Sequence, residues 1–341
     1  MRKKLLFSLA TCLTIFGGAE IGLRLANGWH RHWLDCHRWH PLLGWSLREG
    51  WAGNWAWTGG FSRINAQGLR ADQPVGPKTA GERRLLVVGD SVTFGAKVQT
   101  GQAYPAQLEQ ALRAAGADWH VLNGGVSGYD PAQERDWLAE LGWPLEPDVV
   151  AVAFCRNDVS PSQRRRPLAV GNKHQAPQPP GVLGRWLTEH SIVADRLQRG
   201  VWLAAAHLGW AKATADAADT DDQVAGWPFV EHAYRGMAQQ ARARGCPVVL
   251  FIYPTLDGLE GRTVDQLSEQ LQALGAELGW AVIDLAPAFT PDAADLFFAG
   301  DAFHPNAAGY QRVAAYAAQT LTAKAILPTA AGTILQASSA R

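Results

Sequence analysis

The residues of this chain best suited to chemistry are a serine, a histidine and an aspartate. Ser91 lies in a Gly-Asp-Ser corner directly after a short apolar run. A serine hydroxyl is a weak nucleophile at neutral pH and needs a base within hydrogen-bond reach. His304 can be that base because imidazole titrates near neutral pH. Asp301, three residues earlier, can hold the imidazole in one tautomer. Together these residue types can carry out acyl transfer through a covalent intermediate.

Acyl transfer also needs hydrogen-bond donors for the negative charge that develops on the carbonyl oxygen. The backbone N–H groups of Ser91 and Gly128 and the side-chain amide of Asn157 can supply them. A glycine at position 128 lets the backbone approach the substrate closely. We therefore predict an oxyanion hole from these three residues. We expect Asp90 and Asp158 to brace the neighbouring loops by hydrogen bonding.

The candidate residues follow apolar runs that are typical of buried parallel strands. These runs are Leu85–Val88, His120–Leu122, Val149–Phe154, Val248–Tyr253 and Ala281–Leu285. Helical patterns cover Ala106–Ala115, Pro131–Leu141, Gln223–Arg244, Thr263–Leu278 and Ala307–Ala323. Asp130, with Gln133 as its capping-box partner, and Asn306 are the expected N-caps of the second and last of these helices. This alternation predicts a doubly wound, three-layer α/β domain. Because such sheets bind ligands at the carboxyl ends of their strands, the candidate residues should meet at one edge. Alone, the Gly-Asp-Ser corner would fit an ordinary strand-to-helix turn equally well.

Four sequence blocks together resemble the SGNH (GDSL-type) serine hydrolases. The blocks are Gly89-Asp90-Ser91, Gly128 within NGGVSGYD, Asn157-Asp158 and Asp301-x-x-His304, in the family's order over residues 84 to 323. The resemblance implies a flavodoxin-like sheet of five parallel strands, a Ser-His-Asp triad and the oxyanion hole described above. One departure is Cys155, followed by Arg156, where the family usually has a glycine two residues before the asparagine. The backbone there should bend less freely.

The amino-terminal region predicts a membrane anchor. A basic start precedes an apolar run over Leu5–Ala19, which extends to Ala26 if Glu20 and Arg24 are tolerated. We expect an uncleaved signal anchor over residues 1–26 and a catalytic domain in the periplasm. A cleaved signal peptide, which would give a secreted protein, and a buried core helix are the alternatives. This region also resembles a bacterial subgroup of these hydrolases with an anchoring helix. That likeness rests on Pro41-Leu42-Leu43-Gly44-Trp45 and Ile64-Asn65-x-x-Gly68-Leu69-Arg70.

Residues 27–83 form a segment rich in tryptophan and histidine, followed by a linker from residue 71. Seven of the chain's 15 tryptophans and four of its ten histidines lie between positions 29 and 57. Tryptophan beside an anchor suits the membrane interface. An aromatic platform for sugar rings, or a metal site from His30, His32, Cys36 and His37, are alternatives. The residues Trp55, Trp57, Phe61 and Ile64 alternate around Gly59-Gly60 as they would in a strand or a hairpin.

The hydrolase domain is expected over residues 84–325, with an insertion at 160–222 and a disordered tail at 326–341. The insertion carries an amphipathic pattern from Arg185 to about Ala211. A connection this long between strands suggests a lid over the site or a second membrane-facing surface. A decorated crossover helix is the simpler alternative.

Composition excludes several classes of partner. The chain of 341 residues carries 31 basic and 31 acidic residues. It therefore has no basic field for nucleic acid. The cysteines match neither a zinc pattern nor a disulfide framework, and Cys155 and Cys246 should lie at opposite ends of a strand pair. We expect no cofactor and no metal.

The leading functional hypothesis is a serine esterase or deacylase that cleaves O-acyl or O-acetyl esters through an acyl-enzyme on Ser91. Its substrate could be an acylated polysaccharide or a lipid, with the N-terminal helix as its contact to the membrane. An O-acyltransferase that uses a sugar hydroxyl in place of water fits the same residues. A non-catalytic carbohydrate-binding module on a hydrolase fold is the third possibility. Acyl chain length and oligomeric state are left open.

Overall fold

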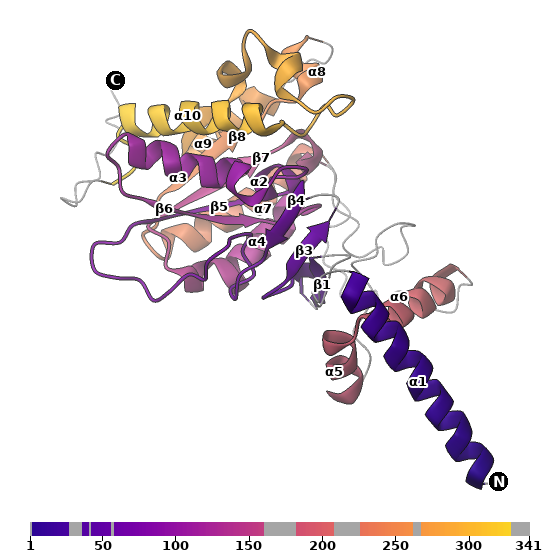
Figure 1. The fold of residues 1–341 in the computed structure, drawn as a ribbon. Coiled ribbons are helices and arrows are strands. Elements are labelled where there is room, and N and C mark those ends of the chain that lie inside the picture. Colours follow the sequence, from indigo (N-terminus) through magenta and orange to yellow (C-terminus); the bar gives the residue numbers. More distant parts are fainter. Residues whose placement is uncertain are drawn as a thin grey trace.

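A five-stranded parallel sheet between two layers of helices positions the candidate site (Figure 1). The structure, a computed structural model, describes residues 2–26, 36–40, 42–55, 58–159, 182–207, 226–261 and 267–328. The strands are β5 (Arg84–Gly89), β6 (His120–Gly125), β7 (Val149–Phe154), β8 (Val248–Ile252) and β9 (Ala281–Asp284). Their order is β6-β5-β7-β8-β9. This is the flavodoxin-like order, so the predicted fold class and all five predicted strands are confirmed.

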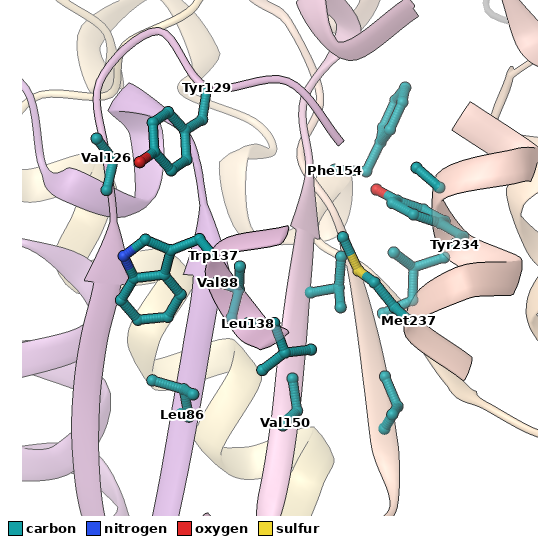
Figure 2. Packing of buried hydrophobic residues seen from close by; sticks show 14 of the residues in the cluster. Leu86, Val88, Val126, Tyr129, Trp137, Leu138, Val150, Phe154, Tyr234 and Met237 are labelled. Carbon is teal, nitrogen blue, oxygen red and sulfur yellow. The ribbon is translucent and has the colours of Figure 1, made fainter. Parts of the chain in front are cut away.

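One face of the sheet is covered by α4 (Pro131–Trp137), α7 (Trp227–Arg242) and α9 (Leu267–Leu278). Alternate strand residues point to opposite faces, and Leu86, Val88 and Val150 point to this one. Figure 2 shows Trp137 and Leu138 gathered over these strand side chains, beside Tyr234 and Met237 of α7. Burial of each such aliphatic side chain stabilises the folded state by roughly 1.5–3 kcal/mol.

The other face is covered by α3 (Tyr104–Ala114) and α10 (Ala307–Ala323), which pack against each other. Leu85, Val87 and Val149 point into this second core. Asn306 begins α10, since its side chain accepts hydrogen bonds from the N–H groups of residues 308 and 309. Asp130 begins α4 with the predicted capping box: its carboxylate accepts from Gln133 N at 2.9 Å. Both predicted caps are therefore confirmed.

Two antiparallel hairpins precede the sheet in the described part of the chain. The first joins β1 (His37–His40) to β2 (Gly44–Leu47), and the second joins β3 (Ala52–Trp55) to β4 (Gly60–Arg63). The second hairpin confirms the prediction around Gly59-Gly60, whereas the first was not predicted. Buried side chains from this segment, including Leu43, Trp45 and Ile64, belong to the same hydrophobic core as Leu86 of the sheet. The described residues between 43 and 69 thus share the core of the three-layer domain.

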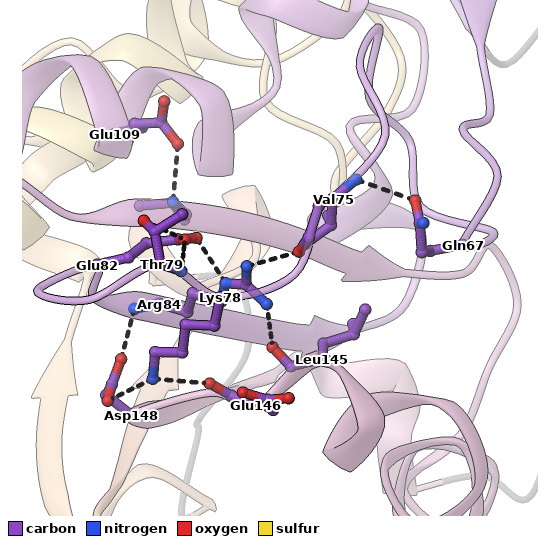
Figure 3. A network of polar contacts seen from close by, with 12 residues as sticks. Gln67, Val75, Lys78, Thr79, Glu82, Arg84, Glu109, Leu145, Glu146 and Asp148 are labelled. Carbon is purple, nitrogen blue, oxygen red and sulfur yellow. Dashed lines mark hydrogen bonds and ion pairs between the residues drawn. The ribbon is translucent and has the colours of Figure 1, made fainter.

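Polar contacts fix the segment that leads into the sheet (Figure 3). Arg84 is buried and donates to the carbonyl oxygens of Leu145 and Gly76, each at 2.8 Å. Its Nε also donates to Glu82 Oε1 at 2.6 Å, and this hydrogen bond lowers the pKa of Glu82 to about 2. Lys78 pairs with Asp148 at 2.7 Å. The residues predicted as a linker therefore follow a defined path along the domain.

Helices α1 (Arg2–Ala26), α5 (Val182–His190) and α6 (Ile192–His207) lie outside the three-layer domain (Figure 1). Residues Leu6–Leu25 of α1 are long and apolar enough to cross a membrane, a test that signal sequences also pass. The prediction of a single amphipathic helix from Arg185 is wrong, because the helix is interrupted between α5 and α6. Ser191 causes this break by accepting a hydrogen bond from Ala194 N at 3.0 Å, which begins a new helix.

Several predictions fall outside the described residues. These are His30 and His32 of the possible metal site, residues 160–181 and 208–222 of the insertion, and residues 329–341 of the expected disordered tail.

Candidate active site

Ser91 occupies the corner that follows β5. It is the first residue of the short helix α2 (Ser91–Phe94), and its side chain is partly exposed. Asp90 caps this helix by accepting a hydrogen bond from Val92 N at 2.8 Å. The first N–H groups of a helix have no carbonyl partner within it, so the Ser91 N–H is directed away from the helix body. The corner therefore presents a hydroxyl and an N–H at the carboxyl edge of the sheet.

The structure brings Ser91, His304 and Asp301 together. Ser91 Oγ lies 2.9 Å from His304 Nε2, and His304 Nδ1 lies 2.8 Å from Asp301 Oδ2. With its proton on Nδ1, toward the carboxylate, the imidazole directs the Nε2 lone pair at the serine hydroxyl. Asp301 Oδ1 also accepts from the backbone N–H of Phe303 at 3.0 Å and of His304 at 3.1 Å. The loop before α10 is thereby folded around the carboxylate.

Lys97 is a neighbour of this triad that sequence reasoning missed. Its Nζ forms an ion pair with Asp301 Oδ2 and lies 5.5 Å from the centre of the Phe298 ring. Lys97 has a positive φ of 66°, a conformation uncommon outside glycine. Burial alone would raise the pKa of Asp301, but hydrogen bonds from Lys97, Phe303 N–H and His304 outweigh it and hold that pKa well below its ordinary value. Asp301 is therefore a stable anion at neutral pH.

The predicted oxyanion donors lie on three loops at the same sheet edge. Asn157 lies in the 3₁₀ turn Arg156–Val159, and its Nδ2 donates to Asp90 Oδ2 at 2.8 Å. An amide nitrogen carries two hydrogens, so one remains for a ligand. Gly128 follows β6 with a φ of 81°, which glycine adopts readily. Its loop is joined to the Ser91 corner because Val126 N donates to the Gly89 carbonyl at 3.0 Å.

Asp90 and Asp158 play the bracing roles that we predicted. Asp90 links Val92 N to the Asn157 amide, and Asp158 Oδ2 accepts from Cys155 N at 2.8 Å. Cys155, which replaces the family's glycine, is buried, and burial raises the pKa of its thiol. The backbone turns after Cys155 into the 3₁₀ segment without a glycine.

Residues of the first hairpin brace the Gly128 loop. Trp45 Nε1 donates to the Ser127 carbonyl at 3.1 Å, and Tyr129 Oη donates to the Trp45 carbonyl at 2.6 Å. The two aromatic rings are 5.7 Å apart. A Cβ atom at Gly128 would lie 3.4 Å from the Trp45 ring. The tryptophan-rich segment thus contributes directly to the shape of the predicted oxyanion loop.

Arg70 holds the turn that follows Ser91. Its guanidinium is buried and donates to the carbonyls of Phe94 (2.9 Å), Gly95 (2.5 Å), Thr58 (2.8 Å) and Val98 (2.6 Å). It also lies 4.6 Å from the centre of the Phe94 ring. Desolvation lowers the pKa of Arg70 to about 10, so the side chain stays charged at neutral pH. Its place at the end of the block Ile64–Arg70 was the only sequence signal for this role.

A pair of buried carboxyl groups lies beneath the site. Burial, together with the charges of neighbouring acids, raises the pKa of Glu134 on α4 and of Asp158 well above the ordinary values. Neither carboxyl oxygen of Glu134 meets a hydrogen-bond donor within the part of the chain that the structure describes. Sequence reasoning did not anticipate this acid, because position 134 reads as an ordinary polar residue in the first turn of a helix.

No cluster of metal-ligating residues is found within the described ranges. Cys36 and His37 of the possible metal site are buried side by side, with Sγ 3.8 Å from Nδ1. Cys155 and Cys246 are free thiols at opposite ends of the β7–β8 pair.

The fold and this site define a class of enzyme, and comparison with known proteins identifies its family. Residues 87–312 match the GDSL-like lipase/acylhydrolase family. The chain therefore belongs to this family. The matched region contains all five predicted site residues: Ser91, Gly128, Asn157, Asp301 and His304.

Individual relatives match over shorter stretches. The chain is 32% identical to the esterase TesA of Pseudomonas aeruginosa over 94 residues, which are 26% of this chain and 47% of that protein. It is 33% identical to an arylesterase of Vibrio mimicus over 75 residues, which are 22% of this chain and 38% of the relative. The chain thus spans less than half the length of these two relatives.

Two solved structures are similar at low sequence identity. A crystal structure of TesA aligns at 20% identity with a TM-score of 0.44, covering 71% of this chain and 99% of that one. A catalytic mutant of Axe2, an acetylxylan esterase from Geobacillus stearothermophilus, aligns at 19% identity with a TM-score of 0.43, covering 71% and 93%.

Proposed function

We propose that this protein is a serine esterase or deacylase that hydrolyses carboxylic esters through an acyl-enzyme on Ser91. The observation that carries the proposal is the continuous hydrogen-bonded path from Ser91 Oγ through His304 to Asp301. A nucleophile, a base and a group that orients the base, all within hydrogen-bond reach, are the parts that nucleophilic catalysis needs. Membership of an ester-hydrolysing family supports the same chemistry.

Acylation begins when Ser91 Oγ attacks the ester carbonyl carbon and His304 Nε2 takes the hydroxyl proton. Asp301 stabilises the resulting imidazolium. The tetrahedral intermediate collapses, the bond to the leaving oxygen breaks, and His304 gives its proton to that oxygen. An alcohol leaves, and the acyl group stays on Ser91.

Deacylation repeats these steps with water as the nucleophile. His304 takes a proton from water as the water oxygen attacks the acyl carbon. His304 then donates that proton to Ser91 Oγ as the bond between Ser91 Oγ and the acyl carbon breaks and the carboxylic acid leaves. We propose that the N–H groups of Ser91 and Gly128 and the free amide hydrogen of Asn157 stabilise the oxyanion in both halves. One such donor typically stabilises the transition state by about 2.7–4 kcal/mol.

We also propose where the enzyme works and on what. Helix α1, with its apolar stretch Leu6–Leu25, would anchor the chain in a membrane and hold the catalytic domain outside the cytoplasm. Phe303, beside the catalytic histidine in sequence, is 38% exposed and offers an apolar surface for an acyl or aryl group. O-acetyl or O-acyl esters of a polysaccharide or a lipid near that membrane are the proposed substrates.

The decisive test is the Ser91→Ala variant of the full chain. We expect it to lose hydrolysis of p-nitrophenyl acetate and labelling by a fluorophosphonate probe, while its thermal unfolding temperature is unchanged. Ser268→Ala, on α9, is the matched control and should behave like the wild type. Hydrolysis by Ser91→Ala at the wild-type rate would refute the proposal. A labelled acetyl donor given with a polysaccharide would show whether the acyl group passes to sugar or only to water.

A further inference from the structure

The carboxyl-terminal part of α1 is docked against the hairpin formed by α5 and α6. The carboxylate of Glu20 on α1 accepts hydrogen bonds from the Ser191 hydroxyl at 2.9 Å, from Val193 N at 3.0 Å and from Ile192 N at 3.2 Å. These N–H groups begin α6, where a helix leaves its first donors unpaired and favours negative charge. Helix α1 therefore supplies the capping carboxylate of α6.

Arg24 strengthens the same junction. Its Nε donates to Glu20 Oε1 at 2.6 Å, and its Nη2 donates to the His190 carbonyl at 2.6 Å, where α5 ends. Glu20 and Arg24 are the charged residues within the stretch Leu6–Leu25. Charged residues at membrane depth are costly unless they are paired. Here they are paired with each other and with the ends of α5 and α6.

The two hairpin helices expose apolar side chains that the domain does not cover. The exposed fractions on α5 are 77% for Val182, 69% for Leu183 and 52% for Trp186. On α6 they are 58% for Leu197 and 69% for Val201. The spacing of three and four residues puts Leu183 with Trp186, and Leu197 with Val201, on one side of their helices. Each helix thus presents an apolar face.

This apolar surface continues that of α1. Figure 1 shows α5 and α6 beside α1 and outside the three-layer domain. Side chains of α1 near this junction are exposed as well, 53% for Ile21 and 68% for Leu25. A soluble protein rarely leaves so many neighbouring apolar side chains in water. Tryptophan beside the end of an apolar helix is typical of the membrane interface.

We propose that α5 and α6 form a membrane-docking surface whose apolar face enters the interface of the bilayer that α1 crosses. The partner is lipid, because the face is continuous with the candidate membrane span and is joined to it through Glu20 and Arg24. Amphipathic helices that lie in the interface bind in this way. The proposal rests on the membrane anchor proposed for α1 and is independent of the esterase chemistry.

Quenching by brominated lipid tests the proposal, because bromine on acyl chains quenches tryptophans that contact the lipid. The full chain is reconstituted into vesicles of phosphatidylcholine and phosphatidylglycerol, with and without bromine. We expect Trp186→Phe to lose part of the bromine-dependent quenching. Trp143→Phe is the matched control: Trp143 donates to Gln240 at 2.9 Å within the domain, so its removal should not reduce quenching by lipid.

Two outcomes would overturn the proposal. If Trp186→Phe floats with the vesicles and is quenched as strongly as the wild type, the α5–α6 face does not contact lipid and is covered by protein, such as a second copy of the chain. If the wild-type chain does not float with vesicles at all, both the anchor and the docking surface are wrong. Esterase activity measured on the same samples would be unaffected in either case, which keeps the two proposals separate.

Discussion

Replacing Arg70 by methionine tests whether the N-terminal segment holds the loop that follows Ser91. Methionine preserves much of the side-chain length and apolar contact but removes every N–H donor. The carbonyls of Phe94, Gly95, Thr58 and Val98 would lose their shared partner, as would the Ser62 hydroxyl. Several of these acceptors lie in the turn after Ser91, so both stability and catalysis should decrease.

The size of the effect follows from the burial of the guanidinium. Each hydrogen bond to a charged group contributes about 1.5–3 kcal/mol to stability. The total loss is smaller than the sum over all these bonds, because the freed carbonyls can shift or be reached by water. Leaving a buried carbonyl or hydroxyl acceptor without its donor costs about 1–3 kcal/mol. Because Arg70→Met leaves several such acceptors but no unpaired charge, we expect it to lower the free energy of unfolding by about 4 kcal/mol. For a domain of this size that lowers the unfolding temperature by about 10 °C.

Thermal unfolding of the full chain, followed by circular dichroism, would measure this change. Arg63→Met is the matched control, because Arg63 is exposed and stacks on Phe61 at 5.4 Å. Surface substitutions of this kind usually change stability by no more than about 0.5 kcal/mol. Arg70→Lys should be intermediate, because an ammonium has fewer donors and no planar fork. If Arg70→Met unfolds at the same temperature as Arg63→Met, the reasoning about this side chain is refuted.

Two further substitutions test the electrostatics of the site. Lys97→Met removes one of the hydrogen bonds that hold the pKa of Asp301 low, so Asp301 takes up a proton at a higher pH and no longer orients His304 as an anion there. The acidic limb of the kcat/KM profile should move to higher pH, while Lys78→Met, whose ion pair involves Asp148, leaves it in place; identical profiles would contradict the role of Lys97. Glu134→Gln removes a carboxyl whose pKa is raised in the folded state. Above its ordinary value of 4.5, the folded chain holds this proton more tightly than the unfolded chain, so wild-type stability falls as pH rises. The unfolding temperature of Glu134→Gln relative to wild type should therefore increase between pH 5 and pH 8. The exposed Glu140→Gln is the control and should show no such increase. If the difference in unfolding temperature between Glu134→Gln and wild type stays constant over this pH range, Glu134 is not a buried protonated acid.

The parts of the fold that could be predicted from the sequence are those encoded locally. Val149–Phe154 is continuously apolar and became a strand with those bounds, and Asp130 and Asn306 began their helices as expected. The site was predictable for a topological reason: residues that follow parallel strands share one edge of the sheet. Ser91 and His304, 213 residues apart, meet there at 2.9 Å.

The residues that sequence reasoning missed act through long-range contacts with no local pattern. Lys97, which follows α2 with a positive φ, pairs with Asp301 on the distant loop before α10. Nothing in the sequence distinguishes Trp45 from the neighbouring tryptophans, because its hydrogen bond from Nε1 to the Ser127 carbonyl forms only in the folded chain. The break at Ser191 was hidden because apolar residues continue at helical spacing on both sides, and only the capping hydroxyl marks it.

Because the first hairpin packs into the core, the length of chain between it and α1 limits the distance between the catalytic domain and a membrane that α1 crosses. Residues 27–35 connect Ala26, the end of α1, to Cys36, which is buried in the domain core. Whatever its conformation, a stretch of this length reaches at most about 35 Å. With α1 as the anchor, the enzyme is confined to a thin shell above the bilayer. Esters within that shell experience a high effective concentration of enzyme, and those beyond it are out of reach.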